Sequence, residues 1–345
     1  MSKECVVPRY GGPEVLTLQD KPRERCGSGQ IRIKVAFAGV NFADLAARAG
    51  LYAPAPKPPF ALGFEVSGTV EEAGEGTGFG EGDRVLAVTR FGGYASEVVV
   101  DAVRARKIAG RMSLEEAEAL PAQYLTAYHA LVELAHARRG EKVLIHAVAG
   151  GVGTAAVQLC KHLGLVSIGT ASSEAKLGFA RGQGLDVGIN YDKEDFEAAV
   201  ARVTDGRGVD VALDANGGVS FGKSFRCLAH GGRLIVYGAA AVLPASISIR
   251  GVKDWPKAAL EVARQRWFHP FELISRNASV SGLQLLLMWD RADVFARDLG
   301  ELMALYEQGA IRPVVDEVFR LQNADAAHRY LHERRTRGKV LLRAS

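Results

Sequence analysis

The sequence predicts an α/β chain of two domains, in which a β-rich first domain precedes a domain built on a doubly wound parallel sheet. Length favours two domains, because 345 residues are more than one hydrophobic core usually contains. Beyond residue 140, short β-branched apolar runs alternate with helical stretches, as in βαβ units. Before residue 100 the apolar runs are short and punctuated by glycine, and no βαβ pattern occurs.

The first domain is predicted from four strand-like runs that glycines separate. They extend over Ile31 to Ala38, Val66 to Val70, Arg84 to Val88 and Ala95 to Val100. Runs of this length, bounded by turn residues, are typical of the strands of a β-rich domain. We expect this domain to occupy residues 1 to 120.

The most informative segment lies at the start of the second domain. Residues Val143 to Gly153 combine an apolar, β-branched strand with a glycine turn, and a helix follows from Thr154. Glycines at this place let the backbone approach a pyrophosphate at the helix N-terminus. Aligned with G-x-G-x-x-G, the loop keeps Gly150 and Gly153 but has Val148 at the first glycine position. The alternative is a tight strand-to-helix turn that binds no ligand.

Four further strands favour a dinucleotide site over that alternative. The first helix is expected to end near Gly164, and helical segments separate the later strands. Those strands are predicted at Val166 to Thr170, Val187 to Asn190, Val209 to Leu213 and Arg233 to Tyr237. The alternation predicts a Rossmann domain over residues 121 to 270, with a sheet edge that extends to about residue 288. Residues 289 to 345 are expected to return to the first domain.

Charge and hydropathy exclude two classes of partner. The net charge is only +4, and the cations are dispersed except for a run from Arg334 to Lys339, so we expect no nucleic-acid surface. Every long apolar run is interrupted well before about 18 residues, which predicts no membrane span. The first residues carry no secretory signal. We therefore expect a soluble, cytoplasmic protein.

Two motifs carry a resemblance to a known family. The stretch from Gly140 through the glycine loop to Lys161 resembles the signature of the zinc-free quinone oxidoreductase branch of the medium-chain dehydrogenase/reductase superfamily, except at Val148, where a small residue is usual in that branch. The stretch from Gly39 to Asp44, with Tyr52 further on, resembles the substrate-domain motif of the same branch. The resemblance implies a GroES-like β-barrel catalytic domain plus a Rossmann doubly wound parallel-sheet domain.

A narrower resemblance concerns the end of the second domain. Residues 263 to 271 (ARQRWFHPF) and 277 to 283 (NASVSGL) are similar to the VAT-1 group of this branch, although Leu283 stands where those relatives usually have phenylalanine. The resemblance implies that the segment shapes the substrate pocket or a dimer contact. The alternative is an ordinary amphipathic helix followed by an edge strand.

The residues at the metal positions of related enzymes predict that no metal is bound. Zinc alcohol dehydrogenases of the superfamily have a Cys-His pair where this chain has Asn41 and Phe42, and Gly-His-Glu where it has Gly63, Phe64 and Glu65. Phenylalanine cannot ligate zinc, and catalytic zinc needs three protein ligands. The four cysteines, at positions 5, 26, 160 and 227, are too far apart to suggest a disulfide frame or a zinc cluster.

The end of the second Rossmann strand favours NADPH over NADH. An NAD site usually has an acidic residue there, whereas this chain has Ala171-Ser172-Ser173. Donors for a 2′-phosphate are Ser172, Ser173, Lys176 and Tyr191, and the resemblance assigns the serine, lysine and tyrosine to that phosphate. Lys176 could instead be a surface lysine, and the neighbouring Glu174 would compete for the same cations.

The remaining cofactor contacts come from later strand ends and from the resemblance. Loops at the carboxyl ends of the fourth and fifth strands should flank the nicotinamide ribose. The resemblance implies that Thr126 lies near the nicotinamide and that Lys339, in Gly-Lys-Val, closes over the cofactor. The predicted cofactor-binding residues are therefore Thr126, Ala149, Gly150, Gly151, Val152, Gly153, Ser172, Ser173, Lys176, Tyr191, Asn216, Tyr237, Gly238 and Lys339.

Conjugate reduction is the chemistry that remains when no Lewis acid is available. Hydride addition to an enone or quinone places charge on a delocalised enolate, which hydrogen-bond donors can stabilise. The candidate catalytic residues are Asn41 and Tyr52, both in the matched motif. Alternatively, Tyr52 only packs in the pocket and Asn41 is a turn residue. His146 falls in the buried strand and is expected to be a hydrogen-bonded core residue.

The sequence thus predicts NADPH-dependent, zinc-independent reduction of quinones or α,β-unsaturated carbonyls. Two alternatives stay open: an enoyl-thioester reductase, and a nucleotide-binding structural or regulatory VAT-1-like protein with little turnover. The exposed edge of the Rossmann sheet should be covered by a second copy, because exposed edges are usually covered and because this branch forms dimers. We therefore expect a homodimer that acts on a small molecule.

Overall fold

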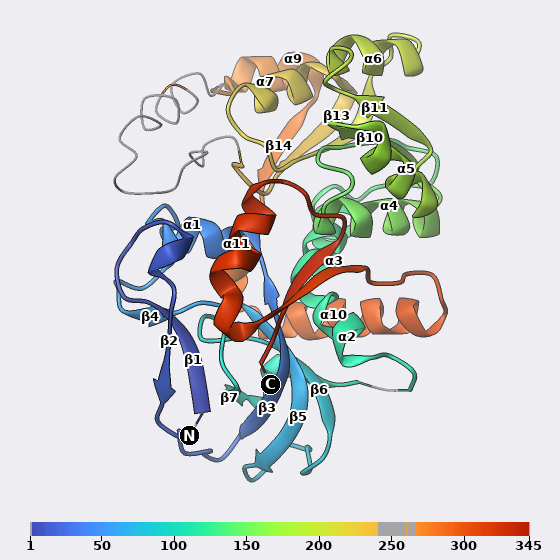
Figure 1. Cartoon of the computed structure of the whole chain (residues 1–345). Coiled ribbons are helices and arrows are strands. Elements are labelled where there is room, and N and C mark those ends of the chain that lie inside the picture. Colours follow the sequence, from blue (N-terminus) through green and yellow to red (C-terminus); the bar gives the residue numbers. More distant parts are fainter. Residues whose placement is uncertain (1, 109, 241–259, 261–266, 345) are drawn as a thin grey trace.

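A six-stranded parallel sheet forms one lobe of the molecule, and a β-barrel that carries both chain ends forms the other (Figure 1). The computed structural model describes residues 2–108, 110–240, 260 and 267–344. Part of the 263 to 271 segment therefore lies outside the described residues. Of the helices described, none is long and apolar enough to cross a bilayer.

The parallel sheet has the strand order β11-β10-β9-β12-β13-β14. The order reverses between β9 and β12, so the two halves of the sheet are wound in opposite directions from this point. This confirms the predicted doubly wound sheet. The strands are β9 (Lys142–Ile145), β10 (Val166–Ala171), β11 (Val187–Asn190), β12 (Val209–Asp214), β13 (Leu228–Val236) and β14 (Ser279–Gly282).

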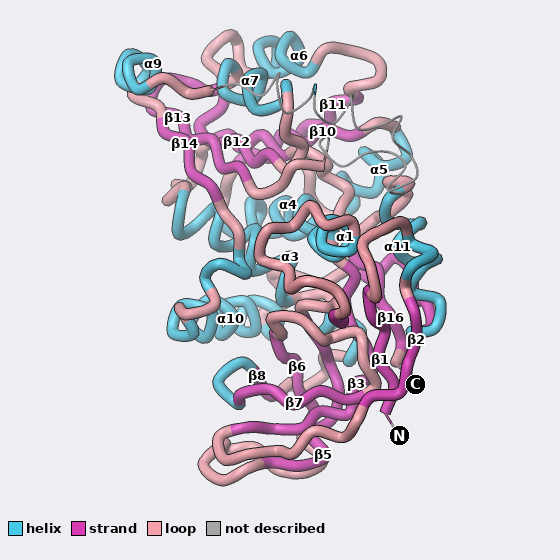
Figure 2. Tube along the Cα trace, turned by 90° about the vertical axis from the view of Figure 1, so that its left-hand side faces the viewer, coloured by secondary structure: helices cyan, strands magenta, loops and turns pink. Residues whose placement is uncertain are grey.

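Helices cover both faces of this sheet (Figure 2). Along β9, Val143 and Ile145 belong to the hydrophobic core on one face, whereas Leu144 belongs to the core on the other. All three are fully buried, which explains why this strand is apolar without alternation. The connecting helices are α4 (Gly151–Leu163), α5 (Glu174–Gly182), α6 (Phe196–Val203) and α7 (Val219–Arg226).

Two boundaries differ from the sequence prediction. Helix α4 begins at Gly151 rather than Thr154, because Gly150 has the extended backbone of an N-cap. Strand β13 begins at Leu228 rather than Arg233, since the pair Gly231-Gly232 lies inside the strand instead of in a turn. The ladder between β12 and β13 shifts register at this place, as expected where glycine interrupts a strand.

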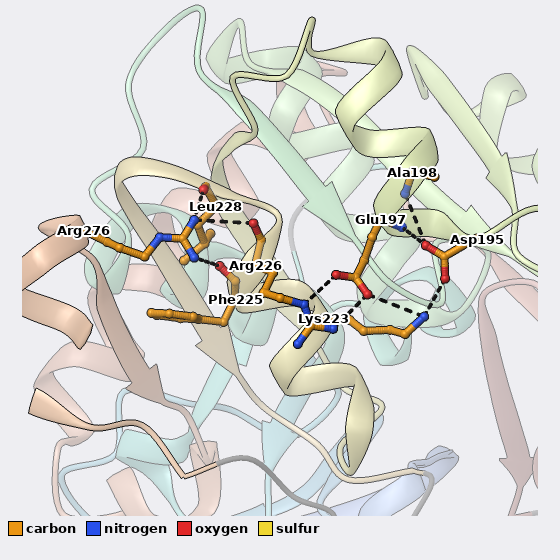
Figure 3. Close-up of polar contacts among 8 residues, drawn as sticks. All are labelled: Asp195, Glu197, Ala198, Lys223, Phe225, Arg226, Leu228 and Arg276. Atoms are coloured by element: carbon orange, nitrogen blue, oxygen red, sulfur yellow. Dashed lines mark hydrogen bonds and ion pairs between the residues drawn. The ribbon is translucent and has the colours of Figure 1, made fainter. Parts of the chain in front are cut away.

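Polar contacts fix the helices on the outer face of the sheet (Figure 3). Asp195 caps α6 by accepting hydrogen bonds from the backbone N–H groups of Glu197 and Ala198. Lys223 of α7 pairs with Asp195 at 2.5 Å, and Arg226 pairs with Glu197. These pairs join the start of α6 to α7.

Helix α9 (Pro270–Arg276) is anchored to the same face. The Arg276 guanidinium donates to the backbone carbonyls of Phe225, Arg226 and Leu228 (Figure 3). An arginine has several donors in a fixed fork, so one side chain can satisfy three carbonyls at the end of α7. The contact holds α9 against α7 and the start of β13.

The other lobe is built around the long strand β3 (Gln30–Val40). Its main sheet has the order β15-β16-β3-β5-β6-β8, and β7 also pairs with β3. The strands are β5 (Glu65–Ala73), β6 (Arg84–Val88), β7 (Glu97–Asp101), β8 (Ala105–Lys107), β15 (Val315–Arg320) and β16 (Lys339–Arg343). A small second sheet contains β1 (Ser2–Val7), β2 (Thr17–Lys21) and β4 (Phe60–Ala61).

The two lobes share a hydrophobic core. It joins Leu86 and Ile108 of the barrel to Leu125 and Ala156 of the other lobe. Helix α3 (Pro121–Tyr128) contacts both lobes, through β6 and α4, and α10 (Ala292–Glu307) packs against α3. Helices α2 (Leu114–Glu118) and α11 (Ala324–His332) pack on the barrel, and a short helix α1 (Phe42–Arg48) follows β3. Since the core is continuous, the domain boundaries at residues 120 and 270 stay a prediction.

Candidate functional site

A cleft of about 1120 Å³ lies between the lobes, at the carboxyl ends of the central strands of the parallel sheet. Its walls contain residues that follow β9, β10, β12 and β13, together with Asn41, Tyr52 and Phe64 of the barrel. Ligands of open α/β sheets bind at this end, where the strand order reverses. The cleft is therefore the candidate binding site.

The glycine loop forms one wall of the cleft at the start of α4. A Cβ on Gly153 would lie 2.5 Å from the Ala147 carbonyl oxygen, so only glycine fits at this position. A Cβ on Gly151 would overlap the side-chain amide of Gln123. The first backbone N–H groups of a helix have no partner within the helix, and they can bind a phosphate. Of the predicted loop residues, Ala149 to Gly153 all line the cleft.

One end of the cleft is positively charged. Ser172, Lys176, Tyr191 and Arg334 line it. The Lys176 ammonium lies 3.4 Å from the Ser172 hydroxyl and donates to the Arg334 carbonyl at 2.6 Å. Burial lowers the pKa of Lys176, and the charges of Arg334 and Arg337 act in the same direction. A group of cations this close together favours an anion such as a phosphate.

Two residues near this end have different roles from those that the sequence suggested. Ser173 is not among the residues that line the cleft; it caps α5 by accepting from the Lys176 backbone N–H. Glu174 does not compete for the Lys176 ammonium, because its carboxylate contacts Asn190, Lys193 and Arg181 instead. The carboxylate that could have opposed a 2′-phosphate is thus engaged elsewhere.

The middle of the cleft contains four of the predicted residues. Thr126, Asn216, Tyr237 and Gly238 line it. The Thr126 hydroxyl donates to the Ala122 carbonyl at 2.6 Å, which leaves its oxygen free to accept a hydrogen bond. Burial raises the pKa of Tyr237, so its hydroxyl stays protonated.

Asn41 and Tyr52 lie on the barrel side of the same cleft. The Asn41 side chain donates to Glu65 at 2.8 Å and accepts from Lys339 at 2.7 Å. The Tyr52 ring packs edge-on against Phe64, with 5.9 Å between ring centroids. Burial raises the pKa of Tyr52, and a hydrogen bond to the Gln284 side chain opposes the increase. Both predicted catalytic side chains therefore reach the cleft.

Lys339 lies behind the cleft wall, contrary to its expected place over the cofactor. Its side chain is fully buried and forms an ion pair with Glu65. The preceding Gly338 does reach the glycine loop, where its backbone N–H donates to the Ala149 carbonyl at 3.1 Å. The chain thus closes on the loop through its backbone, while the ammonium contacts Asn41 and Glu65.

The cleft residues that sequence reasoning missed include Glu65, Gln123, Gln284 and Arg334. In the sequence, Glu65 belongs to a stretch that stands at a metal position of related enzymes, yet a glutamate between apolar residues at the start of a strand also signals a paired buried charge. Arg334 belongs to a basic run of a kind that is usually solvated. No local pattern marks Gln123 or Gln284.

His146 and His129 both have side-chain partners in the protein. His146 is buried directly after β9, with Thr170 at 2.9 Å and Ser224 at 2.8 Å from its two ring nitrogens. Burial lowers its pKa, although the Asp214 charge opposes this. His129, for which the sequence indicates no partner, lies 3.4 Å from Asp298. Within the described ranges, no group of three or more His, Cys, Asp or Glu side chains is arranged to hold a metal ion.

The β-barrel, the Rossmann sheet and the cleft between them define the architecture of a medium-chain dehydrogenase/reductase. Residues 27–132 match the model of the alcohol dehydrogenase GroES-like domain, and residues 183–342 match the model of the zinc-binding dehydrogenase. The chain is 36% identical to the synaptic vesicle membrane protein VAT-1 homolog of Danio rerio, over 99% of this chain and 69% of the relative. It is 32% identical to the 2-haloacrylate reductase of a Burkholderia species, over 99% of each chain.

Solved structures agree with these relatives. The Escherichia coli quinone oxidoreductase, whose structure is a complex with NADPH, is 28% identical, with a TM-score of 0.86 over 99% of each chain. The chain belongs to the quinone oxidoreductase group of the medium-chain dehydrogenase/reductase superfamily, together with the VAT-1 homologues. The predicted family and fold are confirmed.

Proposed function

We propose that this protein is an NADPH-dependent reductase of quinones or α,β-unsaturated carbonyls that acts without zinc. One observation carries the proposal: a single cleft joins the glycine loop and the Lys176 end to the Asn41 and Tyr52 side chains. A cofactor held along the first part would bring its reactive end to the second.

The residues present fit NADPH. The N-terminus of α4 would hold the pyrophosphate, and Ser172, Lys176 and Arg334 would hold the 2′-phosphate. The complex of the related E. coli enzyme with NADPH supports this choice. When bound, NADPH supplies a hydride to the conjugated carbon of the acceptor.

The protein's part is to stabilise charge on the acceptor oxygen. The Asn41 amide and the Tyr52 hydroxyl are donors on the side of the cleft opposite the glycine loop. A donor of this kind contributes about 10²-fold to 10³-fold in rate when it is preorganised in a dry site. Leu125, Leu283 and Phe64 line the cleft and keep this end apolar. A phenol with a raised pKa is a poor acid, so solvent can deliver the proton to the neighbouring carbon.

The side chains at the metal positions support zinc independence. Phe42 and Phe64 cannot coordinate a metal, and Asn41 is engaged by Lys339 and Glu65. These side chains therefore do not fit the catalytic zinc of the alcohol dehydrogenases. The chain matches the GroES-like and zinc-binding dehydrogenase domain models nonetheless.

The second candidate is a nucleotide-binding structural or regulatory protein with little turnover. The similarity to VAT-1 homologues favours it, because those relatives are named as vesicle membrane proteins. An enoyl-thioester reductase is the variant of the first proposal in which the acceptor is thioester-linked. The three functions differ in which acceptor, if any, consumes NADPH.

Oxidation of NADPH and NADH by chelator-treated protein distinguishes them. The acceptors are a quinone, a simple enone, a 2-haloacrylate and an enoyl thioester. Turnover of the quinone or enone with NADPH that survives chelation is the expected result. Tight NADPH binding without turnover of any acceptor would favour the structural reading, and loss of turnover on chelation would refute zinc independence.

We also propose a homodimer formed through the Rossmann edge. Strand β14 is the last strand of the sheet, and nearby Trp267, Phe271 and Ile274 are 93%, 75% and 68% exposed. Large exposed apolar side chains beside a sheet edge favour a protein partner. Sedimentation of the wild type and of Phe271→Asp tests this, since a dimer at this edge should dissociate in the variant. The cytoplasmic location stays a prediction.

A further inference from the structure

The Asn41 side chain is held from behind by two buried charges. The Lys339 ammonium donates to the Asn41 side-chain oxygen at 2.7 Å and forms an ion pair with Glu65. Glu65 in turn accepts from the Asn41 side-chain nitrogen at 2.8 Å. Both charged side chains are completely buried, so water does not screen the pair. The three groups form a closed triangle at the cleft wall, which Asn41 and Glu65 line.

Three neighbouring strands bring these residues together. Asn41 follows the last residue of β3, Glu65 begins β5 and Lys339 begins β16. Strand β3 pairs antiparallel with both β5 and β16, so the end of β3 lies beside the starts of the other two. Residues from distant parts of the sequence thus meet at one edge of the barrel.

The backbone leaves room for this triangle at one position. A Cβ on Gly39 would lie 2.5 Å from the Glu65 carboxylate and 2.6 Å from Cε of Lys339. Any larger residue at this point of β3 would displace the ion pair. Glycine in a strand interior weakens the strand, so its presence here has a local reason, which is the space that the pair occupies.

Further hydrogen bonds fix the triangle to the rest of the site. The second carboxylate oxygen of Glu65 accepts from the Ala122 backbone N–H at 2.6 Å, in the first turn of α3. Helix α3 also carries Thr126, which lines the cleft. The Asn41 backbone N–H donates to the Asp44 carboxylate at 2.8 Å. Asn41 is therefore held through both its backbone and its side chain.

The arrangement determines which hydrogen-bonding groups Asn41 can offer. An ammonium has only donors, so the oxygen of the amide must face Lys339 and the nitrogen must face Glu65. In the opposite orientation, the N–H groups of the amide would face the N–H groups of Lys339, and the amide oxygen would face the Glu65 carboxylate. The amide nitrogen carries two hydrogens, of which Glu65 uses one. Among the residues that the structure describes, the other hydrogen has no partner, and since Asn41 lines the cleft it can be offered to a ligand there.

We propose that Lys339 and Glu65 are positioning residues, which fix Asn41 as a hydrogen-bond donor to the oxygen of the acceptor substrate. The inference rests on the proposed reductase function and assigns Lys339 to the acceptor side of the cleft rather than to the cofactor. The ammonium polarises the amide and so strengthens the donor as charge develops on the acceptor oxygen. The site selects acceptors whose oxygen is a conjugated carbonyl or quinone oxygen.

A double-mutant cycle tests the coupling. Lys339→Met removes the ammonium, Asn41→Ala removes the amide, and the combined variant closes the cycle. Lys339→Met should lower kcat about 10-fold to 100-fold, with the affinity for NADPH changed less than twofold. In the Asn41→Ala background, Lys339→Met should cause no further loss of kcat. Lys107→Met, which removes a half-exposed lysine paired with Asp83, is the matched control and should leave kcat unchanged.

Two results of the cycle would overturn the proposal. If Lys339→Met lowers kcat by the same factor in the wild type and in Asn41→Ala, the lysine does not act through Asn41. Weaker NADPH binding with an unchanged kcat would return Lys339 to the cofactor site.

Asn41→Asp is a second variant that keeps the shape of the side chain. The new carboxylate has no hydrogen for the acceptor and lies against Glu65, so turnover should fall at neutral pH. As the pH is lowered and the carboxyl takes up a proton, it becomes a donor and turnover should recover relative to the wild type. A pH profile parallel to that of the wild type would contradict the donor role, whatever happens to stability.

A measurement without turnover separates this proposal from the proposed function. In protein labelled with ¹⁵N on asparagine, the Asn41 side-chain amide is identified by its absence in Asn41→Ala. Its two proton signals should be widely separated in the wild type and should move together in Lys339→Met. If the two proton signals move together in Lys339→Met while the protein reduces no acceptor, Lys339 positions Asn41 but the proposed reductase function is wrong. If Lys339→Met leaves the two signals unchanged, Lys339 does not position Asn41, even where the protein is an active reductase.

Discussion

Val148 packs against the bare α-carbon of Gly169: its Cγ2 atom lies 2.5 Å from the point that a Cβ on Gly169 would occupy. Val148 stands at the first glycine position of the loop. The side chain is fully buried, and Gly169 lies on the adjacent strand β10. Because Gly169 has no side chain, β10 leaves room for the larger side chain of Val148, and the backbone of the loop is not displaced.

We predict that Gly169→Ala destabilises the fold by about 1–3 kcal/mol, because it overpacks a rigid core. Val148→Ala in the same chain should restore most of this loss. Urea unfolding of the two single variants and the double variant measures both effects. Gly178→Ala is the control, since Gly178 lies on the exposed face of α5 with open space around it and should gain about 0.5–1 kcal/mol. Additive losses in the double variant would show that the two positions are independent.

Lys176→Ala should weaken NADPH binding more than NADH binding. A charge-assisted hydrogen bond contributes about 1.5–3 kcal/mol, which corresponds to a loss of about 10-fold to 100-fold for NADPH alone. Fluorescence titration of both nucleotides measures the ratio. Lys193→Ala, at an exposed lysine that pairs with Glu174, is the matched control and should leave the ratio unchanged. An equal loss for the two nucleotides would remove Lys176 from the phosphate site.

Tyr52→Phe should lower kcat with little change in nucleotide affinity. The substitution removes the hydroxyl, while the ring keeps its packing against Phe64. We expect a decrease of about 10-fold, smaller than the loss of a fully preorganised donor, because the hydroxyl also contacts Gln284. Steady-state kinetics with a quinone at saturating NADPH provides the measurement. If kcat is unchanged, Tyr52 is a packing residue.

Glu118→Gln should change how stability depends on pH. Glu118 is fully buried; burial raises its pKa well above the usual range, and the nearby Glu65 charge raises it further. The unfolded chain has an ordinary pKa of about 4.3, so the folded state holds the proton more tightly. Its contribution to stability is present in full below pH 4 and is lost as the pH rises toward the folded pKa, by at most about 1.4 kcal/mol per pH unit.

Glutamine resembles the protonated acid but does not titrate. The melting temperature of Glu118→Gln should therefore rise relative to that of the wild type between pH 5 and pH 8, as scanning calorimetry would measure. A difference between the two melting curves that stays constant across this range would show that Glu118 is ionised in the folded protein.

Much of the fold could be predicted because its signals are local. The apolar run at Val143 and the glycines after it specify a buried strand and a tight turn within a dozen residues. The lack of an acid in Ala171-Ser172-Ser173, where β10 ends, and the presence of Asn41 and Phe42 at a metal position are likewise visible in short stretches. From these segments, the parallel sheet, the place of the binding site and the family could be predicted.

The roles of single polar side chains were less predictable. Ser172 and Ser173 are adjacent and chemically alike, yet one lines the cleft and the other caps a helix. Glu174 follows them and turns to Asn190, a partner on the next strand of the sheet. Which way a side chain points depends on the helix geometry and on neighbours that composition does not reveal.

The sequence by itself determined the two-domain plan, the glycine loop and the residues available for chemistry, because periodicity and turn propensity act over short segments. Only the tertiary structure decided how those residues are used. Lys339 lies 298 positions from Asn41 and 274 from Glu65, and the three meet because β3 pairs with both β5 and β16. A buried charge must find its partner wherever the folded chain provides one, so strand pairing placed this lysine behind the acceptor side of the cleft.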